Sequence, residues 1–289
     1  MPRWTVDAPA TYDFDRVDAL RVRVIGGSVA VLSTGERACL DIAGVTGQPL
    51  VVSHSDGILT VSYEDLSWDG LLGWLRPDRT SATITITVPK DCPVQLGVVT
   101  ASAVVSGISA ATSVKSVSGA ITLDGVTGAV DARTVSGDIE AQGIGGTIGF
   151  NSLSGDLTLA DGSVDRLEAK TVSGRVTADI ELDRDAALRV ATVSGPVAIR
   201  LPAGTSARVD LRSATGRLLS EFPGLRHSEK PGASTLSGDL EPGDQGPGDQ
   251  GAAAPGSHGV LRVSTMSGQV TLLQRGQPGP PRAAAGAAG

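Results

Sequence analysis

A five-residue pattern recurs through the middle of the chain: an apolar residue, Ser, Gly, any residue and a second apolar residue. The five regular copies begin at Val117, Val135, Leu153, Val172 and Val193. Their Ser residues lie 18 to 21 residues apart. A variant copy begins at Ala214, and a last copy begins at Met266. A fixed period of this length restricts the fold strongly, because it requires repeated units of one shape.

Each period contains two short segments with the alternation of a β-strand. One segment follows the Ser-Gly step, as at residues 121–123, and the other lies between successive steps, as at residues 129–132. Apolar residues alternate with polar or small ones in both, so one side of each strand is expected to be buried and the other wet. A unit of about 20 residues with two strands has the length of one solenoid coil. The predicted fold class is therefore all-β, a β-solenoid or β-helix-like stack of coils about 18–21 residues long.

The Ser-Gly step is interpreted as the corner of each coil. Glycine permits the positive φ angles or close backbone approach that a corner needs, and the preceding hydroxyl can bond a backbone group at the bend. Catalysis by these serines is not expected, because no histidine lies between His54 and His227 to serve as a base. The predicted structural corners are Ser118, Gly119, Ser136, Gly137, Ser154, Gly155, Ser173, Gly174, Ser194, Gly195, Ser267 and Gly268.

The residues before the repeat, 1–95, are predicted to form a β-rich cap region or to begin the same stack of sheets. A cap is expected because the end of a solenoid exposes unpaired strand edges. An insertion at residues 62–78 holds two of the three Trp residues of the chain. Its apolar side chains are either a lid on the sheet edge or a candidate patch that contacts a partner or a membrane surface. They are Trp68, Leu71, Leu72 and Trp74.

The Ser-Gly repeat domain is predicted to span residues 96–274, with one interruption. At residues 226–258 the pattern dissolves and a low-complexity run rich in Gly, Pro, Asp and Gln appears. The glycines of this run do not follow the three-residue spacing of collagen, so a disordered loop extruded from one coil is expected. Residues 275–289, rich in Pro, Ala and Gly, are predicted to be a flexible tail.

Charge and composition limit the partners and the location. The net charge of −7 and the pI near 5.0 argue against binding to nucleic acid. The first residues are acidic where a signal peptide is apolar, so a cytoplasmic location is predicted. The apolar runs are shorter than the ~20 residues that span a bilayer, so a peripheral membrane or surface location would depend on another molecule. Cys39 and Cys92 are expected to be reduced, with a bridge between them left open.

Neither a metal site nor a cofactor site is predicted. The three histidines, His54, His227 and His258, are far apart in the chain and no cysteine stands near them at metal-ligand spacing. The glycine-rich run at residues 143–147 lacks the Asp of calcium-binding repeats. The chain contains no phosphate-binding loop and no dinucleotide fingerprint.

The Val-Ser-Gly-Asp-Ile copy at residues 135–139, the leading segment at residues 2–4 and the segment at residues 63–66 together resemble a known family. It is the bacterial putative-adhesin family of β-strand repeat proteins, a domain of unknown function, in its actinobacterial type. The resemblance covers residues 95–274 through the repeats. It implies a β-solenoid-like stack without assigned catalytic residues, so no site residues are carried over.

The sequence favours a non-catalytic scaffold or interaction protein, in an envelope-stress or regulatory complex, that binds an unknown protein partner or a second copy of itself. One alternative is a cell-surface adhesin exported by a non-classical route. Another is a carbohydrate-active β-helix enzyme, which needs convergent carboxylates, basic groups and aromatic platforms. Asp138, Asp156 and Arg175 fall at one repeat position, and they are interpreted as a solvated surface.

Overall fold

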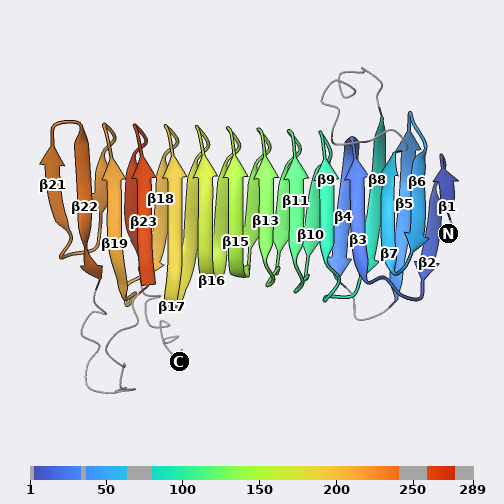
Figure 1. Cartoon of the computed structure of the whole chain (residues 1–289), viewed down its shortest axis with the longest axis horizontal. Helices are drawn as coiled ribbons and strands as arrows, with labels where there is room; N and C mark the ends of the chain where they lie inside the picture. The colour runs from blue at the N-terminus through green and yellow to red at the C-terminus, as the bar shows by residue number, and fades with distance from the viewer. Residues whose placement is uncertain (1–2, 34–36, 64–79, 241–258, 277–289) are drawn as a thin grey trace, which may run out of the picture.

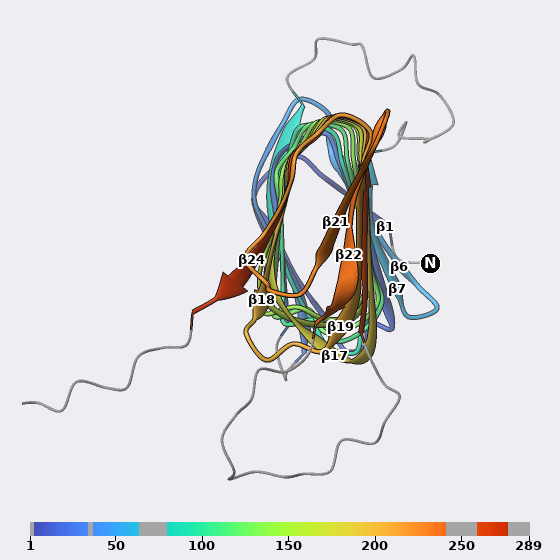
Figure 2. The same cartoon turned by 90° about the vertical axis from the view of Figure 1, so that its left-hand side faces the viewer.

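The computed structural model describes residues 3–33, 37–63, 80–240 and 259–276. In these ranges the regular structure is entirely β-strand, and the strands follow one another along the long axis of the molecule (Figure 1). Seen along that axis, the chain forms a flattened tube with two broad sides (Figure 2). No helix in the described ranges is long and apolar enough to cross a membrane. The fold-class prediction of an all-β solenoid is confirmed.

We call one broad side face A. In spatial order from the N-terminal end, its strands are β1 (Arg3–Val6), β6 (Leu50–Ser55), β7 (Ile58–Tyr63), β3 (Ala19–Val24), β9 (Val94–Val98), β11 (Thr112–Ser116), β13 (Val130–Thr134), β15 (Gly145–Ser152), the second part of β16 (Leu157–Thr171), the second part of β17 (Val176–Thr192), β23 (Gly259–Thr265), β19 (Ala207–Ser213), β22 (Ala233–Leu240) and β21 (Arg226–Lys230).

The opposite broad side is face B. Its strands, in the same direction, are β2 (Ala10–Phe14), β5 (Ala38–Thr46), β8 (Ser81–Val88), β4 (Gly26–Ser33), β10 (Ser102–Ser106), β12 (Ile121–Asp124), β14 (Ile139–Gln142), the first parts of β16 and β17, β18 (Val197–Pro202), β24 (Val270–Arg275) and β20 (Leu218–Ser220). Strands β16 and β17 run across both faces, so each of them forms most of one coil.

Coils in the repeat region stack in parallel and in register. Ile121 of β12 lies beside Ile139 of β14, which lies beside Leu157 of β16, and each of these side chains is at most 2% exposed. Aliphatic side chains therefore stack on their counterparts in the next coil, which suits a narrow interior between two sheets. This arrangement explains why a chain with only 3% aromatic residues can bury a continuous core.

The leading region belongs to the same stack of coils. Strand β3 pairs in parallel with β9, and β4 pairs in parallel with β10, so one hydrophobic core continues across the predicted boundary near residue 95. Aromatic side chains gather at the N-terminal end, where the ring of Trp4 lies 5.4 Å from Tyr12 and 6.3 Å from Phe14. Antiparallel pairing of β1 with β6 and of β2 with β5 ends the parallel stack at this side.

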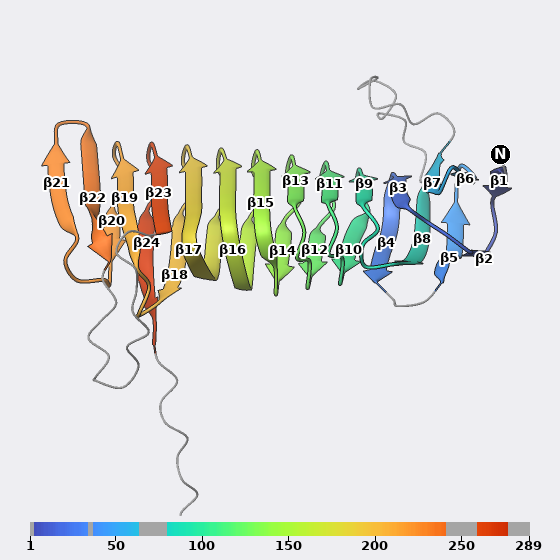
Figure 3. The same cartoon turned by 60° about the horizontal axis from the view of Figure 1, so that its bottom comes forward.

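The last copy of the repeat in the sequence is not the last coil in space. Strand β23 lies between β17 and β19 on face A, and β24 lies between β18 and β20 on face B. We call this inserted pair, residues 259–275, the C-terminal arch; Figure 3 shows it between earlier coils. Arg275 at its end bonds Asp179 and lies 3.2 Å from Glu181, both on β17. These contacts join the end of β24 to β17, which lies beyond β18 on face B.

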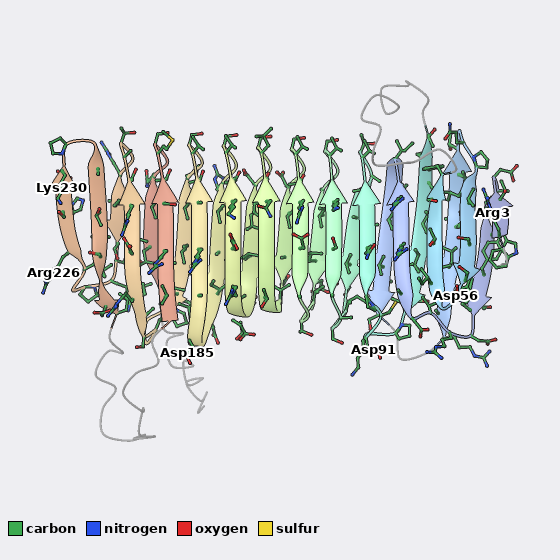
Figure 4. The ribbon with its side chains drawn as sticks, in the orientation of Figure 1. Arg3, Asp56, Asp91, Asp185, Arg226 and Lys230 are labelled. Carbon is green, nitrogen blue, oxygen red and sulfur yellow. The ribbon has the colours of Figure 1, made fainter. Side chains whose placement is uncertain are left out.

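The prediction of disorder is wrong for residues 226–240. These residues form the antiparallel hairpin β21–β22, and β22 pairs with β19 to cover the C-terminal end of face A. All five residues of β21 are exposed, and the ends of this strand, Arg226 and Lys230, are labelled in Figure 4. The remainder of the predicted loop, most of the predicted tail and most of the Trp insertion lie outside the described residues. Cys39 and Cys92 are both free thiols.

Candidate functional site

The glycines of the Ser-Gly steps lie one above another along a narrow edge of the tube, which we call the Ser-Gly edge. A Cβ atom added to Gly137 would overlap the carbonyl oxygen of Gly119, and one added to Gly155 would overlap that of Gly137. The same relation continues to the end of the stack through Gly174, Gly195, Gly268 and Gly216. Close approach of adjacent coils, rather than a positive φ angle, therefore requires glycine at these corners.

The Ser or Thr of each corner donates its hydroxyl to a backbone carbonyl of the preceding coil. The Ser136 hydroxyl donates to the carbonyl of Val117 at 3.3 Å, and the Ser154 hydroxyl donates to that of Val135 at 3.3 Å. Equivalent bonds are donated by Thr100, Ser118, Ser173, Ser194, Thr215 and Ser267. These hydroxyls fasten coils together, and none of them has a histidine partner in the bonds they make.

A second row of hydroxyls, which the sequence analysis missed, lies inside the corner. The amide of Gly137 donates to the Thr134 hydroxyl at 2.8 Å, and the amide of Gly174 donates to the Thr171 hydroxyl at 3.0 Å. The same bond joins Gly155, Gly195, Gly216 and Gly268 to Ser152, Thr192, Ser213 and Thr265. The signal was present in the sequence, because a Ser or Thr stands three residues before the glycine in each of these copies.

The first apolar residue of each copy forms an exposed row along the Ser-Gly edge. Its most exposed members are Val135 at 46%, Leu153 at 53%, Val172 at 42%, Val193 at 42% and Met266 at 61%. The row continues toward the N-terminal end with the partly buried Val117, Val99 and Ile25 and ends at the exposed Ala214. We call this row the apolar ridge. Its exposed members lie outside the core, whose side chains are at most 8% exposed, whereas Ile25 packs against that core.

A second row is formed on face A by the residues that stand two positions before each ridge residue. We call it the basic column, and from the N-terminal end it reads Arg23, Gly97, Lys115, Arg133, Asn151, Lys170, Ala191, Ser264 and Arg212. Five of these nine positions carry a positive charge and none carries a negative one. Ridge and column run side by side, because each coil contributes one residue to each.

A shallow hollow lies on face A where the basic column has small side chains. Ala191 and Ser264 are at this place, with Lys170 and Arg212 on the two sides of them along the column. The neighbouring row, two residues earlier in each strand, adds Glu168, Arg189, Arg262 and Asp210 to the lining. The hollow therefore presents four cations and two carboxylates in fixed positions.

The carboxylates of the hollow are tied to cations on their own strands. The Lys170 ammonium, 2.5 Å from the Glu168 carboxylate, lowers the pKa of Glu168 by hydrogen bonding and charge attraction. Asp210 accepts two bonds from the Arg212 guanidinium, at 2.8 Å and 2.6 Å, and this contact raises the pKa of Arg212. Each acid of the hollow is thus paired with a cation, which suits recognition of a charged surface better than proton transfer.

The other residue types singled out from the sequence lie apart or bond the backbone of a neighbouring coil. No cluster of three His, Cys, Asp or Glu side chains suitable for a metal ion is found there. The Asp156 amide bonds the Asp138 carboxylate at 2.9 Å, and the Arg175 amide bonds the Asp156 carboxylate at 2.7 Å. The carboxylates of Asp138 and Asp156 thus accept hydrogen bonds from the backbone of the next coil. The candidate patch of Trp68, Leu71, Leu72 and Trp74, like His258, lies outside the described residues.

Comparison with solved structures finds bacterial proteins of low similarity. A putative adhesin from Bacteroides fragilis is 12% identical, with 92% of this chain and 97% of that chain covered and a TM-score of 0.40. A putative adhesin from Parabacteroides distasonis is 10% identical, with the same coverage and a TM-score of 0.37. A putative cell adhesion protein from Clostridium sporogenes is 8% identical, with 92% and 100% covered and a TM-score of 0.22. No curated protein matches the sequence.

The family comparison is more informative. The model of the Toastrack DUF4097 family matches residues 42–238, more than half of the chain and most of the coils described above. The actinobacterial type suggested by the leading segment stays a prediction. The stacked coils and the family match lead to one conclusion: this chain belongs to the Toastrack DUF4097 family.

Proposed function

We propose that the protein is a non-catalytic scaffold that holds a protein partner against the charged hollow of face A. The observation that carries this proposal is the arrangement of charge around Ala191 and Ser264, where Arg189 and Arg262 lie between two ion-paired strands. Hydrogen-bonded coils hold the backbone that carries these side chains, so little backbone freedom is lost when a partner binds. Complementary charges on a partner would give specificity and orientation more than raw affinity.

The hollow lacks features that a carbohydrate-active enzyme needs. Its lining contains no aromatic side chain that could stack on a sugar ring, and its two carboxylates are each paired with a cation. The aromatic residues Trp4, Tyr12 and Phe14 lie together at the N-terminal end of the stack, far from the hollow in the order of coils. These features support binding without catalysis.

A charge-reversal experiment tests the scaffold proposal. Full-length protein would be cross-linked in native cells and compared with the double variant Arg189→Glu and Arg262→Glu, which reverses two cations of the hollow. The control, Arg175→Glu with Arg217→Glu, makes the same change in net charge away from it. We expect a protein partner, a component of an envelope-stress or regulatory complex, to be retained by the wild type and the control and lost from the hollow variant.

Two results would contradict this proposal. The first is an unchanged set of cross-linked partners in the hollow variant. The second is hydrolysis of a polysaccharide by the purified protein that disappears in Glu168→Gln. Protease accessibility on intact cells would separately reveal the cell-surface adhesin alternative, because an exported protein is cleaved there while a cytoplasmic scaffold is protected.

A further inference from the structure

The apolar ridge is exposed although the core does not require it. In each coil the ridge residue stands at the turn between faces, outside both sheets, and stacking on its neighbours leaves about half of it in contact with solvent in the central copies. A polar β-branched residue would fit the same backbone. An uninterrupted apolar row runs over nine coils, from Ile25 to Ala214. The other exposed large apolar side chains of the described residues, Val104 and Leu219, form no such row, so the ridge is an unusual surface feature.

The polar atoms beside the ridge are already hydrogen-bonded within the stack. The Ser or Thr that follows a ridge residue donates its hydroxyl to the ridge carbonyl of the preceding coil, as Ser173 does to Leu153 and Ser194 does to Val172. The backbone amide of Ser194 donates to the same Val172 carbonyl at 2.9 Å. Moving this edge into a medium with less water therefore leaves fewer polar groups unpaired than moving an edge whose hydroxyls and carbonyls are bonded only to water.

Charge on the two sides of the ridge is unequal. On the face A side, the adjacent row is the basic column, with five cations and no acid. On the face B side, the adjacent row contains two acids, Asp138 and Asp156, and two cations, Arg175 and Arg217, which cancel. The nearest acids on face A are Asp131, Glu168 and Asp210. They lie in the next row away from the edge, and each pairs with the column residue of its own strand.

We infer that the Ser-Gly edge is a docking surface for an anionic lipid bilayer. The solenoid lies lengthwise on the membrane, with the apolar ridge in the headgroup region and the basic column beside it against the anionic lipids. Long Lys and Arg side chains can extend to the headgroups while their aliphatic parts stay near the ridge. The charge of the whole chain is −7, so the edge is a local exception that orients the protein. This inference rests on the ridge and not on the scaffold proposal, although the hollow shares Lys170 and Arg212 with the column.

Vesicle sedimentation with purified full-length protein tests the inference. The vesicles contain phosphatidylcholine alone or phosphatidylcholine mixed with phosphatidylglycerol. We expect binding to the mixed vesicles and little binding to the neutral ones. Raising the salt from about 0.1 M to about 1 M shortens the screening length from ~10 Å to ~3 Å, so binding should fall strongly.

Two variants separate the roles of ridge and column. The triple variant Val135→Thr, Val172→Thr and Val193→Thr keeps side-chain shape at exposed positions and should weaken binding on the order of tenfold, with an unchanged melting temperature. Its control, Val104→Thr, changes an exposed valine of face B and should bind as the wild type does. For charge, Lys115→Gln with Lys170→Gln should weaken binding roughly fivefold per removed charge.

The matched charge control is Lys90→Gln with Arg37→Gln. Lys90 precedes Asp91, which Figure 4 shows at the opposite narrow edge, so this variant should keep full binding. Equal binding of the ridge variant and the wild type to anionic vesicles would overturn the inference. Binding to a soluble polyanion such as dextran sulfate that is lost in the column variant but kept in the ridge variant would also overturn it. A ridge variant that changes only the oligomeric state of the protein would do the same.

Discussion

Three side-chain choices with separate tasks build the corner of each coil. Glycine allows the backbone of the next coil to approach, the exposed Ser fastens the corner to the preceding coil, and the inner hydroxyl, such as Thr171, bonds the glycine amide. The sequence predicted the first two tasks, because the Ser-Gly step is the most regular feature of the repeat. The inner hydroxyl was not predicted, because a Ser or Thr before an apolar residue also fits ordinary strand alternation.

A single added methyl group at a corner should be costly. We expect Gly155→Ala to lower the free energy of unfolding by about 3 kcal/mol or more, because the new Cβ overlaps the backbone of Gly137 and the coils must separate. Gly149→Ala, in the same coil, is the control: its Cβ would lie 3.7 Å from the nearest atoms and should change stability by less than about 0.5 kcal/mol. Chemical denaturation measures both, and equal effects would contradict the close-approach explanation.

Loss of the inner hydroxyl should also destabilise the corner. Thr171→Val keeps the shape of the side chain but leaves the buried amide of Gly174 without its acceptor, at a cost of about 1–3 kcal/mol. Ser173→Ala removes an exposed hydroxyl with a longer bond of 3.4 Å and should cost less than about 0.5 kcal/mol. A denaturation series in which Ser173→Ala is the more damaging change would show that the outer hydroxyl, not the inner one, holds the corner.

At the scale of strands, the order in space departs from the order in the sequence at both ends of the stack. Strands β6 and β7 lie between β1 and β3 at the N-terminal end, and the C-terminal arch lies between earlier coils at the other end. The regular coils could be predicted because each period pairs with the next one. The position of the C-terminal arch could not, since nothing in residues 259–275 marks which pair of coils they enter. The hairpin β21–β22 was missed for another reason: β21 is exposed along its whole length and therefore lacks the apolar alternation by which strands are recognised.

Removing the arch should affect its neighbours and spare distant coils. A chain ending at residue 258 leaves β17 and β19 without the strand between them, so we expect the amides of residues 207–240 to lose protection in hydrogen exchange. Residues 112–152 should keep their protection, because solenoid coils depend mainly on adjacent coils. A chain ending at residue 276 is the control. Protection that is lost evenly along the chain would indicate a single cooperative unit instead.

At the scale of the whole molecule, stacking creates surface rows that the linear sequence hides. Members of the basic column and of the apolar ridge are mostly 18 to 21 residues apart, so no window of the sequence shows a basic stripe or an apolar patch. Net charge alone argued against binding to nucleic acid. The apolar ridge was visible as a position in the repeat, but alternation cannot tell a buried corner residue from an exposed one. Charge and exposure thus become informative only after the coils are in register.

The register of the coils is tested most directly by distances between spin labels on face A. With Cys39 and Cys92 replaced, labels would be placed at Ser113 paired with Arg262, and at Ser113 paired with Asp210. Strand spacing of about 4.8 Å predicts ~24 Å for the first pair, five strands apart, and ~29 Å for the second, six strands apart.

Strand β23 of the C-terminal arch should therefore lie nearer to Ser113 than β19 does, although β19 comes earlier in the sequence. Pulsed electron paramagnetic resonance measures both distances. If the distance from Ser113 to Arg262 is the longer one, or if both distributions are broad and unrelated to strand number, the stack of glycine-cornered coils is contradicted. The ridge, the column and the hollow all depend on that stack.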